Sequence, residues 1–164
     1  MTGVTVKSSE LLRTCRLALR PAQAGDLQAL VRAAHDADTS RIEQFLLASL
    51  AWWEPHGYGL WLSTRGEDAA VLGWCGLRPD GHPRRPELMY GVAPEHRGAG
   101  FATEAAQAVV GYAFAGPKVA TVWAATMPTH LGSIRVMEKL GMSFKELTRL
   151  DGVSSVVYEI QNPG

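Results

Sequence analysis

A short turn with two glycines is the part of the sequence best suited to hold a ligand. Gly98 and Gly100 stand in the segment His96–Thr103, between a predicted strand and a predicted helix. Glycine lets the backbone adopt conformations closed to other residues and approach a ligand closely. Successive N–H groups and the positive end of the helix dipole then favour an anion, to which Arg97 adds a cation. An ordinary strand-to-helix turn has the same pattern, so the turn by itself leaves both interpretations open.

The spacing of this turn does not fit two common nucleotide sites. The phosphate loop of NTPases has Lys-Ser or Lys-Thr after its second glycine, where this chain has Phe101 and Ala102. The dinucleotide fingerprint needs a third glycine where Thr103 stands. An anion bound here therefore belongs to a different class of ligand.

The elements that position this turn follow from the hydrophobic periodicity and the turn residues. The sequence predicts a strand at 16–20, helices from about 26 to 34 and from 40 to 52 or 53, strands at 59–64, 70–77 and 87–92, a helix at 101–114, a strand at 119–124, a helix at 131–140, and strands at 144–150 and 153–160. Hairpin signals such as Asp151-Gly152 indicate antiparallel pairing. The strand-helix-strand unit through Val92 and Val119 indicates one parallel pair. We expect an α/β fold with a mixed, mostly antiparallel central sheet flanked by helices.

Length and composition limit the function classes. A chain of 164 residues with 46% hydrophobic residues suits one domain, and we expect it to span 14–164 after a loose lead-in at 1–13. Sixteen basic residues balance sixteen acidic ones, so we expect no nucleic acid and no anionic membrane as partner. No apolar run approaches the ~20 residues of a membrane span, and residues 1–10 lack a signal-peptide core, which favours the cytoplasm.

The two cysteines and the other potential ligands do not indicate a metal site. Cys75 lies in a predicted strand and Cys15 stands directly before one, and we expect two buried thiols rather than a disulfide. The spacing of His, Cys and carboxylate residues matches no metal site, so we expect no metal.

The glycine turn lies in a longer motif. The segment 92–102, VAPEHRGAGFA, resembles the acetyl-CoA motif of the GNAT superfamily of N-acetyltransferases, with Arg97, Gly98 and Gly100 at its defining positions. The segments 14–21, 102–105, 112–114 and 133–141 are similar to the branch that contains the ribosomal-protein N-terminal acetyltransferases. The resemblance covers almost all of the chain from Thr14 to Ile160.

This resemblance implies the GNAT-like acyl-CoA N-acyltransferase fold and acetyl-CoA as co-substrate. It implies direct transfer of the acetyl group to a primary amine, either a protein N-terminus or a small molecule. A non-catalytic acyl-CoA-binding or sensor module is the alternative, and a homodimer is left open. The residues implied to bind the cofactor are Tyr90, Gly91, Val92, Arg97, Gly98, Ala99, Gly100, Phe101, Ala102, Thr103, His130 and Ser133.

The reaction needs a base for the amine and an acid for the departing thiolate. An N-terminal amine, with a pKa of ~8, and a lysine amine, with a pKa of ~10.4, are mainly protonated at neutral pH. The resemblance implies Glu87 as the base; alternatively it is a solvated charge or pairs with Arg84 or Arg85. It implies Ser133 as the acid; alternatively this serine bonds its own helix backbone.

Two departures from the branch adjoin these positions. Met89 replaces a small residue, commonly glycine, and we expect it to narrow the site near Glu87. His130 replaces a common asparagine and can still donate to a carbonyl or a phosphate. The aromatic cluster at 52–58 stands where this fold builds its acceptor wall, but the pattern is more typical of a core.

Overall fold

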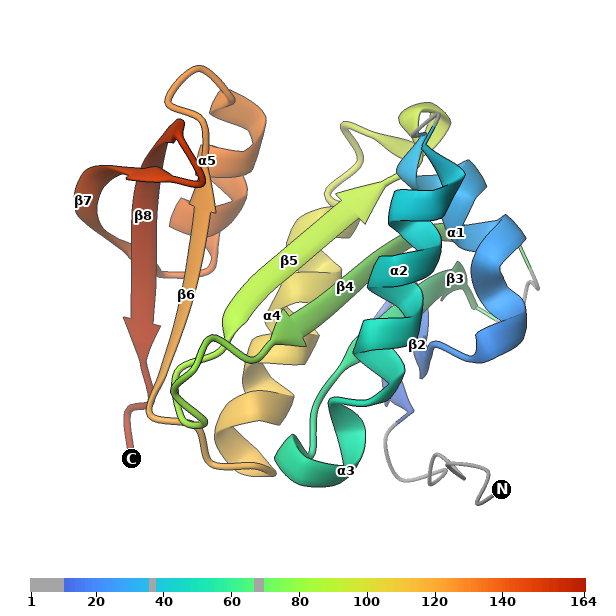
Figure 1. Ribbon diagram of the computed structural model, residues 1–164, viewed down its shortest axis with the longest axis horizontal. Coiled ribbons are helices and arrows are strands. Elements are labelled where there is room, and N and C mark those ends of the chain that lie inside the picture. Colours follow the sequence, from blue (N-terminus) through green and yellow to red (C-terminus); the bar gives the residue numbers. More distant parts are fainter. Residues whose placement is uncertain (1–10, 36–37, 67–69) are drawn as a thin grey trace.

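The computed structural model describes residues 11–35, 38–66 and 70–164, and these form one eight-stranded sheet with helices on both faces (Figure 1). The strands are β1 (Leu12–Arg13), β2 (Leu17–Pro21), β3 (Leu60–Arg65), β4 (Val71–Arg78), β5 (Glu87–Val92), β6 (Thr121–Thr126), β7 (Ser143–Leu150) and β8 (Val153–Gln161). The helices are α1 (Leu27–Ala34), α2 (Thr39–Leu50), α3 (Trp53–His56), α4 (Phe101–Ala115) and α5 (Leu131–Lys139), with 3-10 turns at Ala24–Asp26 and Pro94–His96.

The strand order confirms the predicted fold class. The strands lie in the order β1-β2-β3-β4-β5-β6-β8-β7. Among the described residues, β5 and β6 form the one parallel pair and the other neighbours are antiparallel. The long connection through α4 joins β5 to β6, as parallel strands require. The sheet is therefore mixed and mostly antiparallel.

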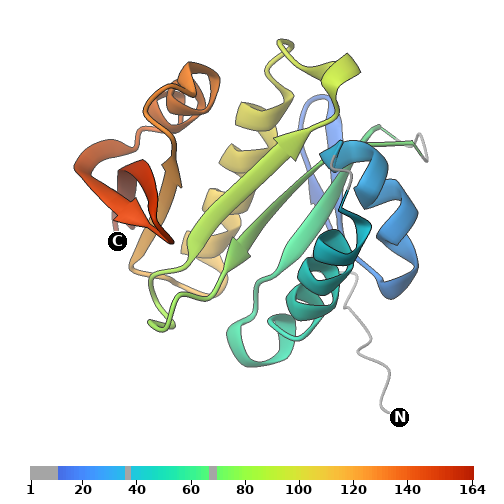
Figure 2. The same cartoon turned by 45° about the horizontal axis from the view of Figure 1, so that its top comes forward.

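The sheet divides between β5 and β6. Of the described residues in these strands, only Glu87 and Trp123 pair across the boundary, whereas β6 and β8 pair at six positions. Beyond that pair the two strands diverge (Figures 1 and 2). The backbone of β5 from Leu88 onward therefore has no neighbouring strand on its β6 side.

Two hydrophobic clusters define the faces of the sheet. The larger cluster packs α4 and α5 against one face, and the smaller packs α1 and α2 against the other. Leu88 and Tyr90 of β5 belong to the larger cluster, and residues alternate along a strand. Glu87, Met89 and Gly91 therefore face the side covered by α1 and α2.

The N-terminal prediction needs a correction. Residues 1–10 of the predicted lead-in lie outside the described residues, but Leu12 and Arg13 form β1 and pair with β2. Cys15 is exposed rather than buried, because the chain turns at Thr14, whose N–H donates to the Leu17 carbonyl at 2.9 Å. Cys75 is buried in β4 as predicted, and burial raises the pKa of its thiol well above its usual range.

The aromatic cluster that follows α2 belongs mainly to the core. Trp53 and Tyr58 are buried in the larger cluster, and the rings of Trp53 and Trp61 meet edge to face at 4.7 Å. The sequence pattern was correctly interpreted here.

Within residues 11–35, 38–66 and 70–164, no helix is long and apolar enough to cross a membrane. The same residues contain no group of three or more His, Cys, Asp or Glu side chains placed to hold a metal ion.

Candidate functional site

A cleft of about 800 Å³ lies where β5 and β6 diverge. Its walls come from β5, the glycine turn, the first turn of α4, the end of β6 and one side of α5. It brings together all of the predicted site residues except Ala99, namely Glu87, Tyr90, Gly91, Val92, Arg97, Gly98, Gly100, Phe101, Ala102, Thr103, His130 and Ser133. Residues separated by 46 positions in the chain thus line one space.

The glycine turn has the geometry that its sequence predicts. Gly98 has φ of 80° and Gly100 has φ of 83°, a region that residues with a side chain rarely adopt. Gly100 is the N-cap of α4, so the turn leads directly into the first N–H groups of the helix. Arg97 lies against the end of β5 and donates through Nε to the Val92 carbonyl at 3.0 Å. The turn therefore presents backbone donors and one cation to the cleft.

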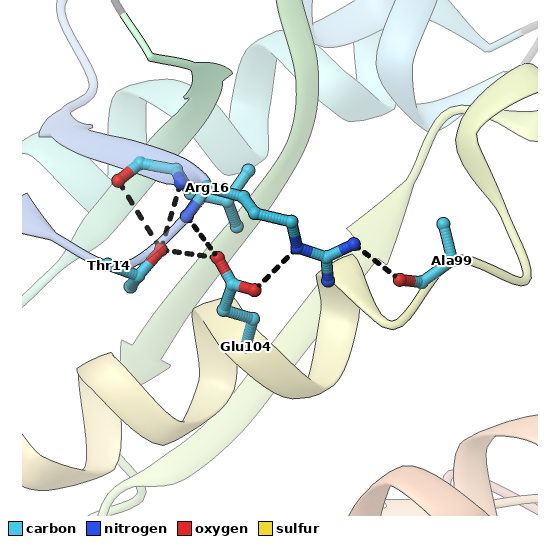
Figure 3. A network of polar contacts seen from close by, with 5 residues as sticks. Thr14, Arg16, Ala99 and Glu104 are labelled. Atoms are coloured by element: carbon cyan, nitrogen blue, oxygen red, sulfur yellow. Dashed lines mark hydrogen bonds and ion pairs between the residues drawn. The ribbon is translucent and has the colours of Figure 1, made fainter.

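A polar network that includes Arg16 and Glu104 holds this turn in place (Figure 3). The Arg16 Nε donates to Glu104 Oε1 at 2.8 Å, and its Nη1 donates to the Ala99 carbonyl at 2.8 Å. The Arg16 backbone N–H and the Thr14 hydroxyl both donate to Glu104 Oε2. The guanidinium also lies 4.3 Å from the centre of the Phe101 ring. The start of β2 is thereby fixed to the start of α4.

The carboxylate of this network is held in its charged form. Burial by itself would raise the pKa of Glu104, but the hydrogen bonds from Thr14 and Arg16 outweigh it and the pKa lies below its ordinary value. Ala99, predicted to contact the cofactor, lies outside the cleft lining, and its carbonyl binds Arg16 instead.

Glu87 lies at the closed end of the cleft, where β5 and β6 pair. It forms an ion pair with Arg78, which faces it across the β4–β5 ladder, rather than with Arg84 or Arg85. Its side chain is 12% exposed. Burial raises the pKa of Glu87, Arg78 opposes the shift, and the nearby charges of Asp80 and Asp151 add to it. A largely buried carboxylate with a raised pKa is a stronger base than a solvated one.

Tyr90 and Ser133 meet on the opposite face of the sheet. The Tyr90 hydroxyl oxygen lies 2.7 Å from Ser133 Oγ, and it also donates to the Ser133 carbonyl at 3.1 Å. Both residues line the cleft. Burial raises the pKa of Tyr90, although the hydrogen bond with Ser133 opposes the shift. The sequence suggested Tyr90 for its backbone only, so its side-chain role was missed.

Helix α5 adds cations that the sequence analysis did not identify. Arg135 and Lys139 line the cleft from one side of the helix, four residues apart, and His130 precedes them at the N-cap. His130 Nδ1 lies 3.1 Å from Thr126 Oγ1. The spacing of four was the available signal, since such residues share a helix face. With Arg97, these groups make this wall suitable for a ligand with several negative charges.

The cleft also reaches the face of the sheet covered by α1 and α2. Ala33 and Ala34 of α1, Trp74 of β4 and Met89 of β5 line it there. Because Tyr90 and Ser133 line it from the other face, the cleft passes through the sheet where the strands diverge. An anionic ligand bound at the glycine turn can therefore meet a second molecule that enters from the opposite face.

The sequence matches a known family. Residues 16–143 match the acetyltransferase (GNAT) domain. Of the curated proteins, YkkB of Bacillus subtilis is 33% identical over 106 residues, which are 63% of this chain and 62% of YkkB. YjcK of the same species, which carries the name of an N-acetyltransferase, is 39% identical over 72 residues, which are 44% of this chain and 40% of YjcK. These matches span less than two thirds of either relative.

Solved structures share the fold over nearly the whole chain. An acetyltransferase from Agrobacterium tumefaciens has a TM-score of 0.81 and 25% identity, covering 95% of this chain and 96% of its own. The ribosomal-protein-S5-alanine acetyltransferase from Vibrio fischeri has a TM-score of 0.78 and 12% identity, and the match covers 93% of this chain and 97% of that one. A spermidine N-acetyltransferase from Vibrio cholerae has a TM-score of 0.73 and 15% identity, and the match covers 91% of this chain and 95% of that one. With its family match and its strand order, the chain belongs to the GNAT acetyltransferase family.

Proposed function

We propose that the protein is an acetyl-CoA-dependent N-acetyltransferase that transfers the acetyl group directly to a primary amine. The observation that carries the proposal is the cleft through the sheet, with an anion-binding turn on one side and the carboxylate of Glu87 at its closed end. Family membership supports the same reaction. The two ends of this cleft offer separate routes for the acetyl donor and for the amine.

The residues at the open end fit coenzyme A. The backbone N–H groups from Gly98 to Thr103 and the positive end of α4 would bind the pyrophosphate. Gly100 has φ of 83°, so a residue with a side chain would strain the backbone of this cradle. Arg135 and Lys139 supply charge for the other phosphate. The side of β5 that β6 leaves unpaired, from Tyr90 to Val92, would bond the pantetheine arm as a neighbouring strand does.

Acetyl-CoA supplies an activated thioester, so the protein needs no covalent intermediate. Glu87 would take a proton from the incoming ammonium, directly or through water, and leave a neutral amine able to attack. A backbone N–H of β5 would bond the developing oxyanion. The nitrogen would lose its second proton to solvent as the amide forms. Ser133 would donate its proton to the departing sulfur and recover one from Tyr90, whose hydroxyl lies 2.7 Å away and which regains its own proton from solvent.

The test is acetyl transfer by the purified protein. Release of free thiol from acetyl-CoA would be followed with a panel of amines and N-terminal peptides, and CoA binding would be followed separately by the rise in melting temperature. We expect thiol release that depends on the amine, and a fall of about 10²-fold or more in Glu87→Gln with CoA binding retained. A protein that CoA stabilises but that acetylates no amine would contradict the proposal and favour a binding module.

A further inference from the structure

Three cross-strand pairs carry the cleft wall on the face covered by α1 and α2, and Trp74, Gly91, Met89 and Glu87 from these pairs line the cleft. Across the β4–β5 ladder, Trp74 faces Gly91, Gly76 faces Met89, and Arg78 faces Glu87. All of these residues point to the same side of the sheet, because their positions alternate with those of Leu88 and Tyr90. The wall therefore runs from a tryptophan, past a methionine, to a carboxylate.

Trp74 has a fixed place in this wall. Its ring meets Phe45 of α2 edge to face at 5.9 Å, and a side chain at Gly91 would come within 2.6 Å of the indole. The indole thus lies over a backbone position that only glycine can leave free. The result is a flat apolar surface beside the β5 backbone.

Met89 fills the space between this surface and Glu87. Its cross-strand neighbour, Gly76, has no side chain, and a side chain there would come within 2.8 Å of the Gly59 carbonyl oxygen. The thioether of Met89 is therefore the group that sets the width of the cleft beside the carboxylate. Methionine is flexible, so it narrows the passage and can still adapt to a small guest.

The charges on this face suit a single ammonium group. Among the described residues that line the cleft from α1, from β4 and from this side of β5, Glu87 is the ionisable one. The C-terminal end of α1 lies at the same wall through Ala33 and Ala34, and the negative end of its dipole also favours a cation. Asp80 and Asp151 lie near enough to raise the pKa of Glu87. Beyond Glu87 the side chains of this wall are apolar apart from the indole N–H of Trp74, which has no hydrogen-bond partner among the described residues.

We propose that the acceptor is a primary monoamine with a compact apolar group next to its amino group, and that Met89 and Trp74 select that group. This inference rests on the proposed function, because it assumes that the amine reaches the cleft from the face opposite the glycine turn. A polyamine would have to place its remaining charges against Ala33, Ala34 and Trp74, where no second carboxylate of the described residues lines the cleft, so those charges would lose water without gaining an ion pair. Two kinds of acceptor carry an amino group next to a compact apolar group: a short arylalkylamine and a peptide that begins with an apolar residue.

The experiment compares kcat/KM for four acceptors at saturating acetyl-CoA. Phenylethylamine and a peptide that begins with Met represent the two sources of the proposed chemistry, while spermidine and a peptide that begins with Asp are the mismatched acceptors. We expect at least one matched acceptor to exceed both mismatched ones by about 10-fold or more. Equal or better use of spermidine or of the Asp peptide would overturn the inference while leaving acetyl transfer intact. A protein that acetylates none of the four overturns this inference, and the wider panel of amines and peptides then decides whether the proposed function also fails.

Variants of Met89 test the selecting residue. Met89→Gly should raise kcat/KM for tryptamine, a bulkier amine, relative to phenylethylamine by about 10-fold, because it widens the passage. Met89→Leu keeps the volume and is the matched control, with little change in that ratio. Binding of CoA, followed by melting temperature, should be the same in both variants. An unchanged ratio in Met89→Gly with CoA binding retained would overturn the role of Met89.

Discussion

The hydroxyl oxygen of Tyr90 lies 2.7 Å from Oγ of Ser133, although the two residues are 43 positions apart and come from β5 and α5. This contact joins β5 to α5 beside the cleft, on the face of the sheet covered by α4 and α5. Two hydroxyl groups in series can pass a proton and recover it, which neither group does alone. The pair therefore defines a unit for mutagenesis.

Removal of the Tyr90 hydroxyl should slow the reaction without weakening donor binding. We expect Tyr90→Phe to lower kcat by about 10-fold with little change in KM for acetyl-CoA, and Ser133→Ala to lower kcat by about 10²-fold. Because the two groups act as one unit, the double variant should be no slower than Ser133→Ala. Steady-state thiol release measures all three. Effects that multiply in the double variant would show that the hydroxyls act independently.

Glu87 should control the low-pH limb of the rate profile. Its raised pKa means that kcat/KM should climb as the pH rises through that value and the carboxylate forms. Glu87→Gln should abolish this limb and lower kcat/KM by about 10²-fold or more, while Glu138→Gln, an exposed change on α5, should leave it in place.

Arg78 supplies a directional check on the same limb. The ion pair with Arg78 favours the charged carboxylate, so Arg78→Ala should raise the pKa of Glu87 further. The low-pH limb should then move to higher pH, with CoA binding unchanged. Movement to lower pH would mean that another group titrates in this limb.

Alanine substitutions at two glycines separate the effect of turn geometry from the effect of an added methyl group. A side chain at Gly98 meets no atom within 4 Å, so Gly98→Ala acts through its φ of 80° and should destabilise the fold by about 1 kcal/mol. It should also weaken CoA binding, because the turn relaxes. Gly111→Ala meets equally open space inside α4 and should stabilise the fold by about 0.5–1 kcal/mol without affecting CoA. Thermal melts with and without CoA measure both changes. If Gly98→Ala leaves the affinity for CoA unaltered, the pyrophosphate of CoA does not bind at this turn.

The network around Glu104 should make stability depend on pH. Its folded-state pKa lies below the ordinary value of 4.5, so the ionised group stabilises the fold above that value. The contribution is lost as the pH falls through the folded-state pKa. Glu104→Gln should therefore lower stability by about 1 kcal/mol at pH 7, and the difference from wild type should shrink toward about pH 3. Melting temperatures across that range are the measurement, and a constant difference would show that the charge is not the cause.

Local signals predicted the part of the site that depends on one stretch of chain. β5 has the predicted bounds of Glu87–Val92 and α4 begins at Phe101, because Pro94 and two glycines mark where each element ends or starts. The residues that the family resemblance implied for the cofactor line one cleft, apart from Ala99. Their binding and catalytic roles remain predictions.

Long-range packing determines the part that the sequence did not predict. Trp74 reaches the cleft only because the β4–β5 register sets it against Gly91, and Ala33 only because α1 crosses both strands. Arg78 was not considered as the partner of Glu87 for the same reason, since the two residues are nine positions apart in the chain and pair only across the strands. Register and helix placement follow from the whole core rather than from any local pattern.

The single pair between β5 and β6 has a mechanical consequence. Glu87 and Trp123 are the one described residue pair between these strands, so the sheet consists of two parts, β1–β5 and β6–β8, that are joined at one point. A molecule bound between the two parts contacts both and takes the place of the absent pairing between β5 and β6. We therefore expect the filled protein to be stiffer than the empty one, with slower amide exchange in β5 and β6. Release of the product would then make the boundary between β5 and β6 flexible again, so that the next donor can enter the cleft.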